Sequence, residues 1–374
     1  MLTRRAFSAS LLGTLLAPMV PQASPAATEA SQATGSLHQA ARTTGRFFGS
    51  AVRSDQLASE GGLLAEVVRQ CGMLTPEIHL KWNSIEHKQG QYWFEPVDEL
   101  VQICRLNGLA LHGHTLLWEQ GTPAWALRAL RRKKDWALIE NHFARVLTRY
   151  KGDALRWDVV NEPIDTQSGR KNLRRNTFHQ VFGASYIERA LHTARAYAPD
   201  AVLMLNDYSF EYDNPVDADR RKAFLQLLER LKADGVPLDG VGVQAHLDLG
   251  KGPLKRTVIA PFLREIGQLG LEIVVTELDV KERDYRASPS VRDSRVANEV
   301  AAYLDIVLDE PAVKGVVTWG MSDRHSWLKV EPGDRTNTRK YGNPAPNRGL
   351  PYDARMRAKP MHNVLEQRLS GRNV

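Results

Sequence analysis

The sequence predicts an α/β protein built as a single (β/α)8 TIM barrel, and three observations support this prediction. The length of 374 residues fits one such barrel, a fold that spans about 200 to more than 400 residues, as well as two ordinary domains. Short apolar runs recur along the chain with helical patterns between them, and polar side chains follow nearly every run. An open doubly wound sheet is the alternative, but no GxGxxG motif follows an early strand.

Eight short apolar runs predict the strands of the barrel. Each run is rich in β-sheet formers and begins roughly 30 to 45 residues after the previous one. The stretches between them repeat apolar residues with the period of a helix, as at Phe224, Leu227 and Leu231. We therefore expect residues 46–370 to form one barrel domain with a parallel sheet. The predicted strands comprise residues 47–49, 77–80, 109–117, 155–160, 202–205, 241–244, 273–276 and 315–319.

Composition and charge exclude several classes of protein. Apolar residues make up 43% and charged residues 25% of the chain, which excludes a disordered, collagenous or coiled-coil protein. The formal net charge is +7. It falls to about +5 without Arg4 and Arg5 of the predicted leader, which is too mild to indicate nucleic-acid binding. Two cysteines, Cys71 and Cys104, cannot build a disulfide framework. We expect two buried thiols, with a single bridge as the alternative.

The first 26 residues have the features of an export signal. Arg4 and Arg5 precede an apolar run over residues 9–20, and small residues follow at 23–27. The run is shorter than the roughly 20 residues that a membrane span needs, and no later segment is predicted to anchor in a membrane. The arginine pair favours the twin-arginine route, with an ordinary secretory leader as the alternative. Residues 27–45 are expected to be a flexible lead-in, and the protein to be periplasmic or extracellular.

Polar side chains gather where the predicted strands end. In a (β/α)8 barrel the carboxyl ends of all strands open onto one face, which is the face that holds the active site. We therefore expect these side chains to surround one cavity. They are Glu77 and Lys81, His112 and His114, Asn161 and Glu162, Asn206 to Tyr208, Gln244 and His246, Glu277 and Asp279, and Trp319.

Two of these carboxylates, Glu162 and Glu277, have the arrangement that glycoside hydrolysis requires. One carboxyl group must donate a proton to the leaving oxygen, and an ionised one must attack the sugar or activate water. Glu277 and Asp279 are two residues apart on a strand, so their side chains point to the same side. His246 ends the neighbouring strand and is placed to bridge them and keep Glu277 ionised. The alternative for either glutamate alone is a solvated loop charge or a helix cap.

Taken together and in this order, the motifs resemble glycoside hydrolase family 10, whose members are mainly endo-1,4-β-xylanases. The resemblance extends from about residue 47 to residue 365. It is carried by residues 157–162, with the sequence WDVVNE, and 276–279, with the sequence TELD. Further matching segments are residues 81–82, 113–116 with Trp118, 206–208, 242–246, and 319–320 with Trp327.

The resemblance implies a retaining hydrolase acting on xylan and xylo-oligosaccharides, with Glu162 as the acid/base and Glu277 as the nucleophile. His246 and Asp279 would support the nucleophile, and Asn161 would bind the 2-hydroxyl of the sugar at the cleavage point. The remaining implied substrate contacts are Glu77, Lys81, His114, Tyr208 and Gln244, with Trp118, Trp319 and Trp327 packing on sugar faces. No cofactor, metal, nucleic acid or membrane is implied, and a monomer is expected.

The chain departs from the family pattern in the part expected to hold the glycone sugars. Ile78 stands where the family usually has Asn, and Glu119 and Gly121 stand where it tends to have His and Gln. These departures are expected to change how the glycone is held, and not whether the bond is cleaved.

Several other hypotheses remain open on the sequence alone. His112, His114 and His246 could ligate a metal, but no further ligand cluster has zinc-like spacing. The basic run at residues 128–134 is expected to be a solvated helix face. A second group is expected at the rim of the cleft, where contact with acidic side groups of a polysaccharide is one reading: Arg170, Lys171, Arg174 and Arg175. A non-catalytic glycan-binding barrel, or a hydrolase of cellulose or mannan, is the alternative function.

Overall fold

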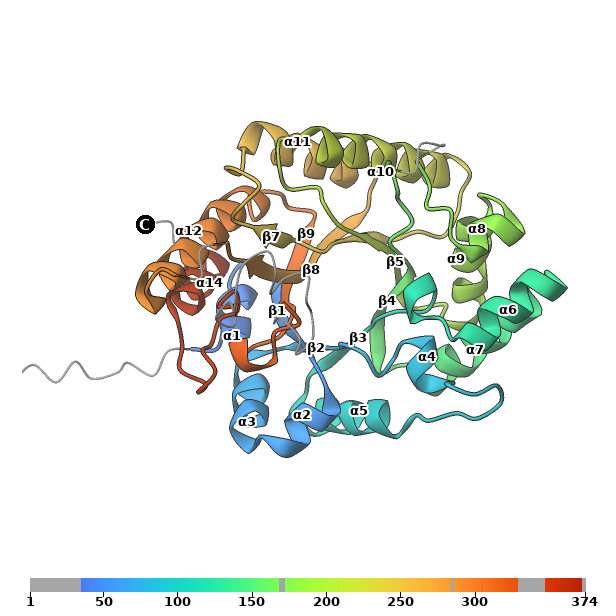
Figure 1. The fold of residues 1–374 in the computed structure, drawn as a ribbon, viewed down its shortest axis with the longest axis horizontal. Helices are drawn as coiled ribbons and strands as arrows, with labels where there is room; N and C mark the ends of the chain where they lie inside the picture. Colours follow the sequence, from blue (N-terminus) through green and yellow to red (C-terminus); the bar gives the residue numbers. More distant parts are fainter. Residues whose placement is uncertain (1–34, 168–171, 284–285, 329–346, 372–374) are drawn as a thin grey trace, which may run out of the picture. The chain divides into compact units, whose positions relative to one another are not determined.

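The computed structural model describes residues 35–167, 172–283, 286–328 and 347–371 (Figure 1). The predicted leader over residues 1–26, with its arginine pair, lies outside the described residues, as do Arg170 and Lys171. None of the helices in the described part of the chain combines the length and the apolar character that a bilayer-spanning helix needs.

Eight parallel strands close into a barrel, which confirms the predicted (β/α)8 fold. Strands β1 to β6 pair in chain order, β6 pairs with β8, and β9 pairs with both β8 and β1, so the sheet has no open edge. An additional short strand, β7 (His246–Asp248), pairs with the carboxyl-terminal end of β8. The barrel strands are β1 (Phe47–Val52), β2 (Met73–Pro76), β3 (Ala110–Gly113), β4 (Ala154–Asn161), β5 (Val202–Asp207), β6 (Gly240–Val243), β8 (Glu272–Lys281) and β9 (Val313–Thr318).

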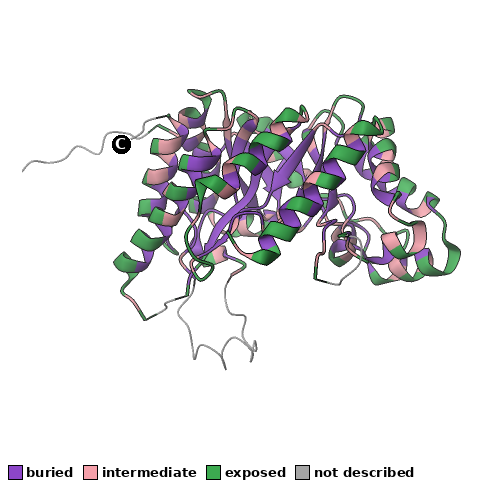
Figure 2. Cartoon of the chain, turned by 90° about the horizontal axis from the view of Figure 1, so that it is seen from above, coloured by how far each residue is buried: buried purple, intermediate pink, exposed green. Residues whose placement is uncertain are grey.

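Helices surround this barrel (Figure 1), and in Figure 2 their buried faces turn toward the strands while their outer faces are exposed. Such one-sided burial is what the helical spacing of apolar residues produces. The helices are α1 (Leu37–Arg42), α2 (Ser54–Ser59), α3 (Gly61–Gln70), α4 (Trp82–Ile85), α5 (Glu95–Asn107), α6 (Ala124–Lys133), α7 (Ala137–Arg149), α8 (Thr177–Phe182), α9 (Tyr186–Tyr197), α10 (Pro215–Ala233), α11 (Arg256–Gln268), α12 (Pro289–Val307) and α14 (Pro360–Leu369), with short 3-10 turns η1 (Glu119–Gly121) and η2 (Asp323–His325).

The helix ends follow from local sequence signals. Helix α10 begins after Asn214, whose side chain accepts a hydrogen bond from the Asp217 amide, and Pro215 occupies its first turn. Both features favour a helix start, because proline needs no amide partner there and the cap satisfies a free N–H. Helix α5 ends at Gly108, which adopts a left-handed φ of 66° that costs glycine little.

The second predicted strand, at residues 77–80, is wrong. The strand is β2, which ends at Pro76, and Glu77 follows it directly, donating its amide to the carbonyl of Val52 at 2.9 Å. Proline is tolerated at the end of a strand, where its missing N–H interrupts no interior part of the ladder. The shift leaves Glu77 just beyond the carboxyl end of the barrel, which is where a side chain can reach the active-site face.

The flexible lead-in expected over residues 27–45 is wrong for its last part. Residues 37–42 form α1, which begins with a reciprocal capping box between Ser36 and Gln39. Leu37 and Ala41 lie one turn apart on α1, and both are fully buried, where the helix packs against α14. Polar composition therefore masked a short amphipathic helix that belongs to the folded domain.

Both cysteines are unpaired and buried, as expected from the sequence. Burial raises the pKa of the Cys71 thiol, and it raises the pKa of Cys104 to about 12. The two side chains therefore act as small apolar groups in the core.

A large side chain of strand β4 packs against a glycine of the neighbouring strand β3. Trp157 on β4 is 1% exposed, and a Cβ built at Gly113 would lie 2.1 Å from its indole ring. Because interiors are close-packed, neither residue has room for added atoms.

Gly113→Ala should therefore destabilise the fold by about 1–3 kcal/mol, the usual cost of overpacking a core. The matched control is Gly62→Ala in α3, where an added Cβ meets nothing within 4 Å. This control should be neutral or stabilising by up to about 1 kcal/mol, because alanine favours a helix over glycine. Urea denaturation measures both. Equal stability of Gly113→Ala and the wild type would contradict the packing argument.

Candidate active site

A cavity of about 490 Å³ opens at the carboxyl ends of the barrel strands. His112, Asn206 and Asp207 were expected around it but do not line it, whereas every residue given a catalytic or binding role does, although these residues come from all parts of the chain. They are Glu77, Lys81, His114, Trp118, Asn161, Glu162, Tyr208, Gln244, His246, Glu277, Asp279, Trp319 and Trp327.

His246 bridges two carboxylates, as the strand spacing indicated. Its Nε2 lies 3.2 Å from Oε2 of Glu277, and its Nδ1 lies 2.8 Å from Oδ1 of Asp279. The second oxygen of Asp279 accepts a hydrogen bond from the indole N–H of Trp327 at 2.6 Å. Each polar atom of this buried group therefore has a partner, which such groups require in a protein interior.

Electrostatics keep this group charged. Burial works to lower the pKa of His246, but Asp279 and Glu277 outweigh it and hold that pKa well above 6.5. Burial likewise works to raise the pKa of Glu277, but the hydrogen bond from His246, the nearby imidazole of His114 and the hydrogen bond from Asn206 lower it on balance. Glu277 is therefore a carboxylate at neutral pH, beside a protonated imidazole.

Asn206 links the two strands that carry the carboxylates. Its Nδ2 donates to Oε1 of Glu277 at 2.7 Å and to Oδ1 of Asn161 at 2.9 Å. Its own oxygen accepts from Thr276 Oγ1 at 2.7 Å. Gly242 makes room for it, because a Cβ there would lie 2.1 Å from Oδ1 of Asn206. Asn206 was expected around the cavity as a strand-end residue without an assigned role, and its place at the end of β5, next to the β4 strand that carries Asn161, was the available signal.

Glu162 lies at the end of β4 with an unusual backbone conformation. Its φ is 54°, a left-handed value that is uncommon for residues other than glycine and that is found at functional sites. The Glu162 amide donates to the carbonyl of Asn206 at 2.8 Å, and Nε of Arg174 donates to the Glu162 carbonyl at 2.7 Å. Arg174 also approaches the Glu162 carboxylate to 3.6 Å. Arg174, which was expected only at the rim of the cleft, therefore positions Glu162.

Lys81, Glu77 and Trp118 form another wall of the cavity. The ammonium group of Lys81 lies 4.8 Å from the centre of the Trp118 ring, a cation–π distance. Burial lowers the pKa of Lys81 although Glu277, Glu77 and Glu162 oppose this. Burial raises the pKa of Glu77, against the effect of Arg53 and Lys81.

The histidines of β3 contact an aspartate. His114 Nδ1 and His112 Nε2 lie 2.8 Å and 3.0 Å from the same oxygen of Asp158. Burial works to raise the pKa of Asp158, but both imidazoles outweigh it and the pKa is lowered. His246, the third member of the metal hypothesis, faces Glu277 and Asp279 instead. Within the described residues, no group of three or more His, Cys, Asp or Glu side chains is arranged to hold a metal ion.

The three departures from the family pattern do not line the cavity. The Glu119 carboxylate accepts hydrogen bonds from the amide of Thr177 at 2.9 Å and from its hydroxyl at 2.5 Å, so it ties η1 to the start of α8. Gly121 is buried beneath Trp118, whose ring would lie 3.0 Å from a Cβ at that position. Ile78 is half-buried.

Comparison with protein families decides the relationship. Residues 36–367 match the sequence pattern of the family described as "Glycosyl hydrolase family 10". The chain belongs to glycoside hydrolase family 10. The family resemblance inferred from the motifs is therefore confirmed, and the chain is a glycoside hydrolase. The match begins at residue 36, which agrees with the inclusion of α1 in the folded domain.

Named relatives of this family 10 chain cover most of its length. Endo-1,4-beta-xylanase 1 of Humicola insolens is 34% identical over 304 residues, covering 80% of this chain and 68% of the relative. Endo-1,4-beta-xylanase 3 of Hypocrea jecorina is 32% identical over 335 residues, covering 89% and 86%. The solved xylanase 10B of Thermotoga maritima superposes with a TM-score of 0.78 at 28% identity, covering 90% of this chain and 98% of that one.

The raised pKa of His246 makes a prediction about the pH dependence of stability. Stabilisation from the protonated imidazole is fully present below the ordinary value of 6.5 and is lost as the pH rises through the raised value. The difference in unfolding free energy between the wild type and His246→Asn should therefore be largest at mildly acidic pH and should shrink on the alkaline side. Urea denaturation over a pH series measures this difference.

The control for loss of a histidine is His192→Asn, at an exposed position on α9. A wild type minus His246→Asn difference that stays constant across the alkaline range would show that the imidazole does not provide this pH-dependent stabilisation.

Proposed function

We propose that this chain, acting as a monomer, is a retaining endo-1,4-β-xylanase that hydrolyses internal β-1,4-xylosidic bonds of xylan by double displacement. The observation that carries the proposal is the pair of glutamates facing one cavity, of which Glu277 is buried, hydrogen-bonded by His246 and Asn206, and held ionised. A carboxylate that is ionised, buried away from bulk water and held in one orientation is suited to attack a carbon centre.

In the proposed reaction, Glu277 attacks the anomeric carbon while Glu162 gives its proton to the leaving glycosidic oxygen. This step forms a covalent glycosyl-enzyme and releases the aglycone. Glu162, now ionised, takes a proton from water, which attacks the same carbon and frees Glu277. Positive charge on His246 stabilises Glu277 before attack and after release, and the amide of Asn161 is proposed to bind the 2-hydroxyl of the sugar. No cofactor enters the scheme.

The proposed substrate rests on the aromatic residues and on the relatives. Trp118, Trp319 and Trp327 line the cavity, and aromatic rings pack well on the C–H faces of pyranoses. Curated relatives are named as endo-1,4-beta-xylanases, and one solved family member, xylanase 10B of Thermotoga petrophila, is described in complex with xylobiose. The aromatic lining fits a pyranose polymer, and the names of the relatives favour xylan and xylo-oligosaccharides over cellulose or mannan.

Replacement of the two glutamates should separate their roles. Glu277→Ala should lose xylan hydrolysis by several orders of magnitude, because no covalent intermediate can form. Glu162→Ala should lose xylan hydrolysis but still react with an activated aryl xylobioside, stall at deglycosylation, and be accelerated by azide to give a β-azide product. Product stereochemistry is read by NMR, and an α-azide product would overturn the retaining mechanism.

The control is Glu229→Ala on the exposed face of α10, which should keep wild-type activity. Rates on xylan, carboxymethylcellulose and mannan, measured side by side, test the substrate. A faster rate on cellulose or mannan than on xylan would contradict the proposed specificity, and no reaction on any of them would favour a glycan-binding barrel.

We further propose that residues 1–26 direct export to the periplasm or the medium by the twin-arginine route. Replacement of Arg4 and Arg5 by lysine keeps the charge but removes the guanidinium pair, and should trap the precursor in the cytoplasm. Immunoblotting of cell fractions measures precursor and mature protein. Normal export of the double variant would indicate the general secretory route instead.

A further inference from the structure

A second cavity, of about 500 Å³, lies between the segment that follows β2 and the start of α6. His87, Lys88 and Arg128 line it and are exposed, and Trp125 forms part of its wall. Within the described part of the chain, no acidic side chain lines this cavity. The cavity is therefore cationic, with an aromatic ring beside the positive charges.

Trp125 is held in place from two sides. Its indole N–H donates to the backbone carbonyl of Glu86 at 2.9 Å, and its ring packs edge-on against Trp82 at 6.1 Å between centres. A fixed aromatic ring is a better platform for a sugar than a mobile one, because no side-chain freedom is lost on binding.

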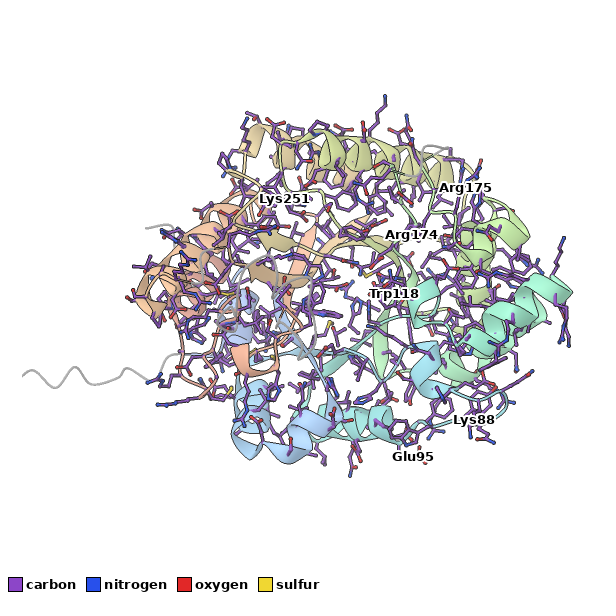
Figure 3. The ribbon with its side chains drawn as sticks, in the orientation of Figure 1. Lys88, Glu95, Trp118, Arg174, Arg175 and Lys251 are labelled. Atoms are coloured by element: carbon purple, nitrogen blue, oxygen red, sulfur yellow. The ribbon has the colours of Figure 1, made fainter. Side chains whose placement is uncertain are left out.

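The same two chain segments wall this cavity and the active-site cavity. Lys81 and Gln120 line the active site, and Asn83 and Thr122, two residues further along each segment, line the second cavity. In Figure 3, Trp118 lies nearer the middle of the barrel and Lys88 farther out, beyond α4. A polysaccharide that leaves the active site between these two segments would therefore reach the second cavity.

A third cavity, of about 510 Å³ beside Tyr208, also contains basic residues but differs in charge. There, Arg220 pairs with Asp207, Lys251 lies 3.5 Å from Asp217, and Arg174 contacts Glu162. These positive charges already have acidic partners, so this cavity is not predisposed to bind an anion. The cationic cavity at Lys88 and Arg128 is the better candidate.

We propose that the cavity lined by Lys88, Arg128 and Trp125 is a distal binding site for a uronic acid side group of xylan. The carboxylate would pair with Lys88 and Arg128, and the sugar ring would pack on Trp125. This inference rests on the proposed function, and it adds a preference for acidic xylan that the catalytic cavity does not explain.

The experiment compares kcat/KM on glucuronoxylan with kcat/KM on the same polymer after its carboxyl groups are reduced to alcohols. The wild type should favour the acidic polymer by about two- to tenfold, in keeping with a pair of exposed ionic contacts. Higher salt should shrink this ratio, because it screens exposed charges. The double variant Lys88→Met, Arg128→Met should bring the ratio close to one, without loss of activity on the reduced polymer or on aryl xylobioside.

The matched control is Lys133→Met, Lys151→Met, which removes the same charge from exposed positions outside the cavity. Lys151 precedes β4 and so lies at the opposite end of the barrel. The control should keep the wild-type ratio. A wild type with no preference for the acidic polymer, a double variant that keeps the preference, or a control that loses it would overturn the proposal. If the wild-type protein is active on aryl xylobioside in any of these cases, the proposed function stands. If it is inactive on every xylan, the proposed function and this inference are both overturned.

Discussion

The hydrogen bonds of one buried amide, Asn206, determine how the catalytic end of the barrel is arranged. The side chain lies at the end of β5 and joins Asn161 on β4 to Glu277 on β8. Its two N–H groups and its oxygen all have partners, so it has a single favourable orientation. Because interiors penalise an unpaired polar group by about 1–3 kcal/mol, displacement of either neighbour would be costly. The amide thereby holds the positions of two strands that carry opposite parts of the chemistry.

Around this amide the barrel buries several charged groups. Glu277, Asp279 and Asp158 are at most 5% exposed, and removing a charge from water is unfavourable unless partners replace the solvent. Imidazoles provide these partners, His246 for the first two carboxylates and His112 with His114 for the third. The apolar core of the barrel must therefore stabilise the fold. The layer of charged groups at the carboxyl ends of the strands is arranged for reactivity instead of stability.

The sequence was informative where contacts follow from spacing along a strand or from the order of strands. The closed barrel, the strand-end residues and the bridge from His246 to Glu277 and Asp279 were predictable for this reason. Other features depend on residues distant in sequence and had no local signal. Glu119 binds Thr177 across two loops, α1 is stabilised by its packing against α14, and the end of β2 at Pro76 depends on pairing with β1. Polar composition suggested a flexible segment at α1, and the apolar run placed the second strand too late, whereas the tertiary contacts determine both elements.

The unpaired cysteines have a consequence for how the protein matures. Only a thiolate reacts readily with oxidants or disulfides, and its population is very small when the thiol pKa is raised far above neutrality. Neither sulfur is therefore available for mixed disulfides, and no covalent cross-link has to form before the barrel is complete. Folding of this chain should require no thiol oxidase and no disulfide isomerase. The same native state is therefore reachable in a reducing cytoplasm and in an oxidising exterior.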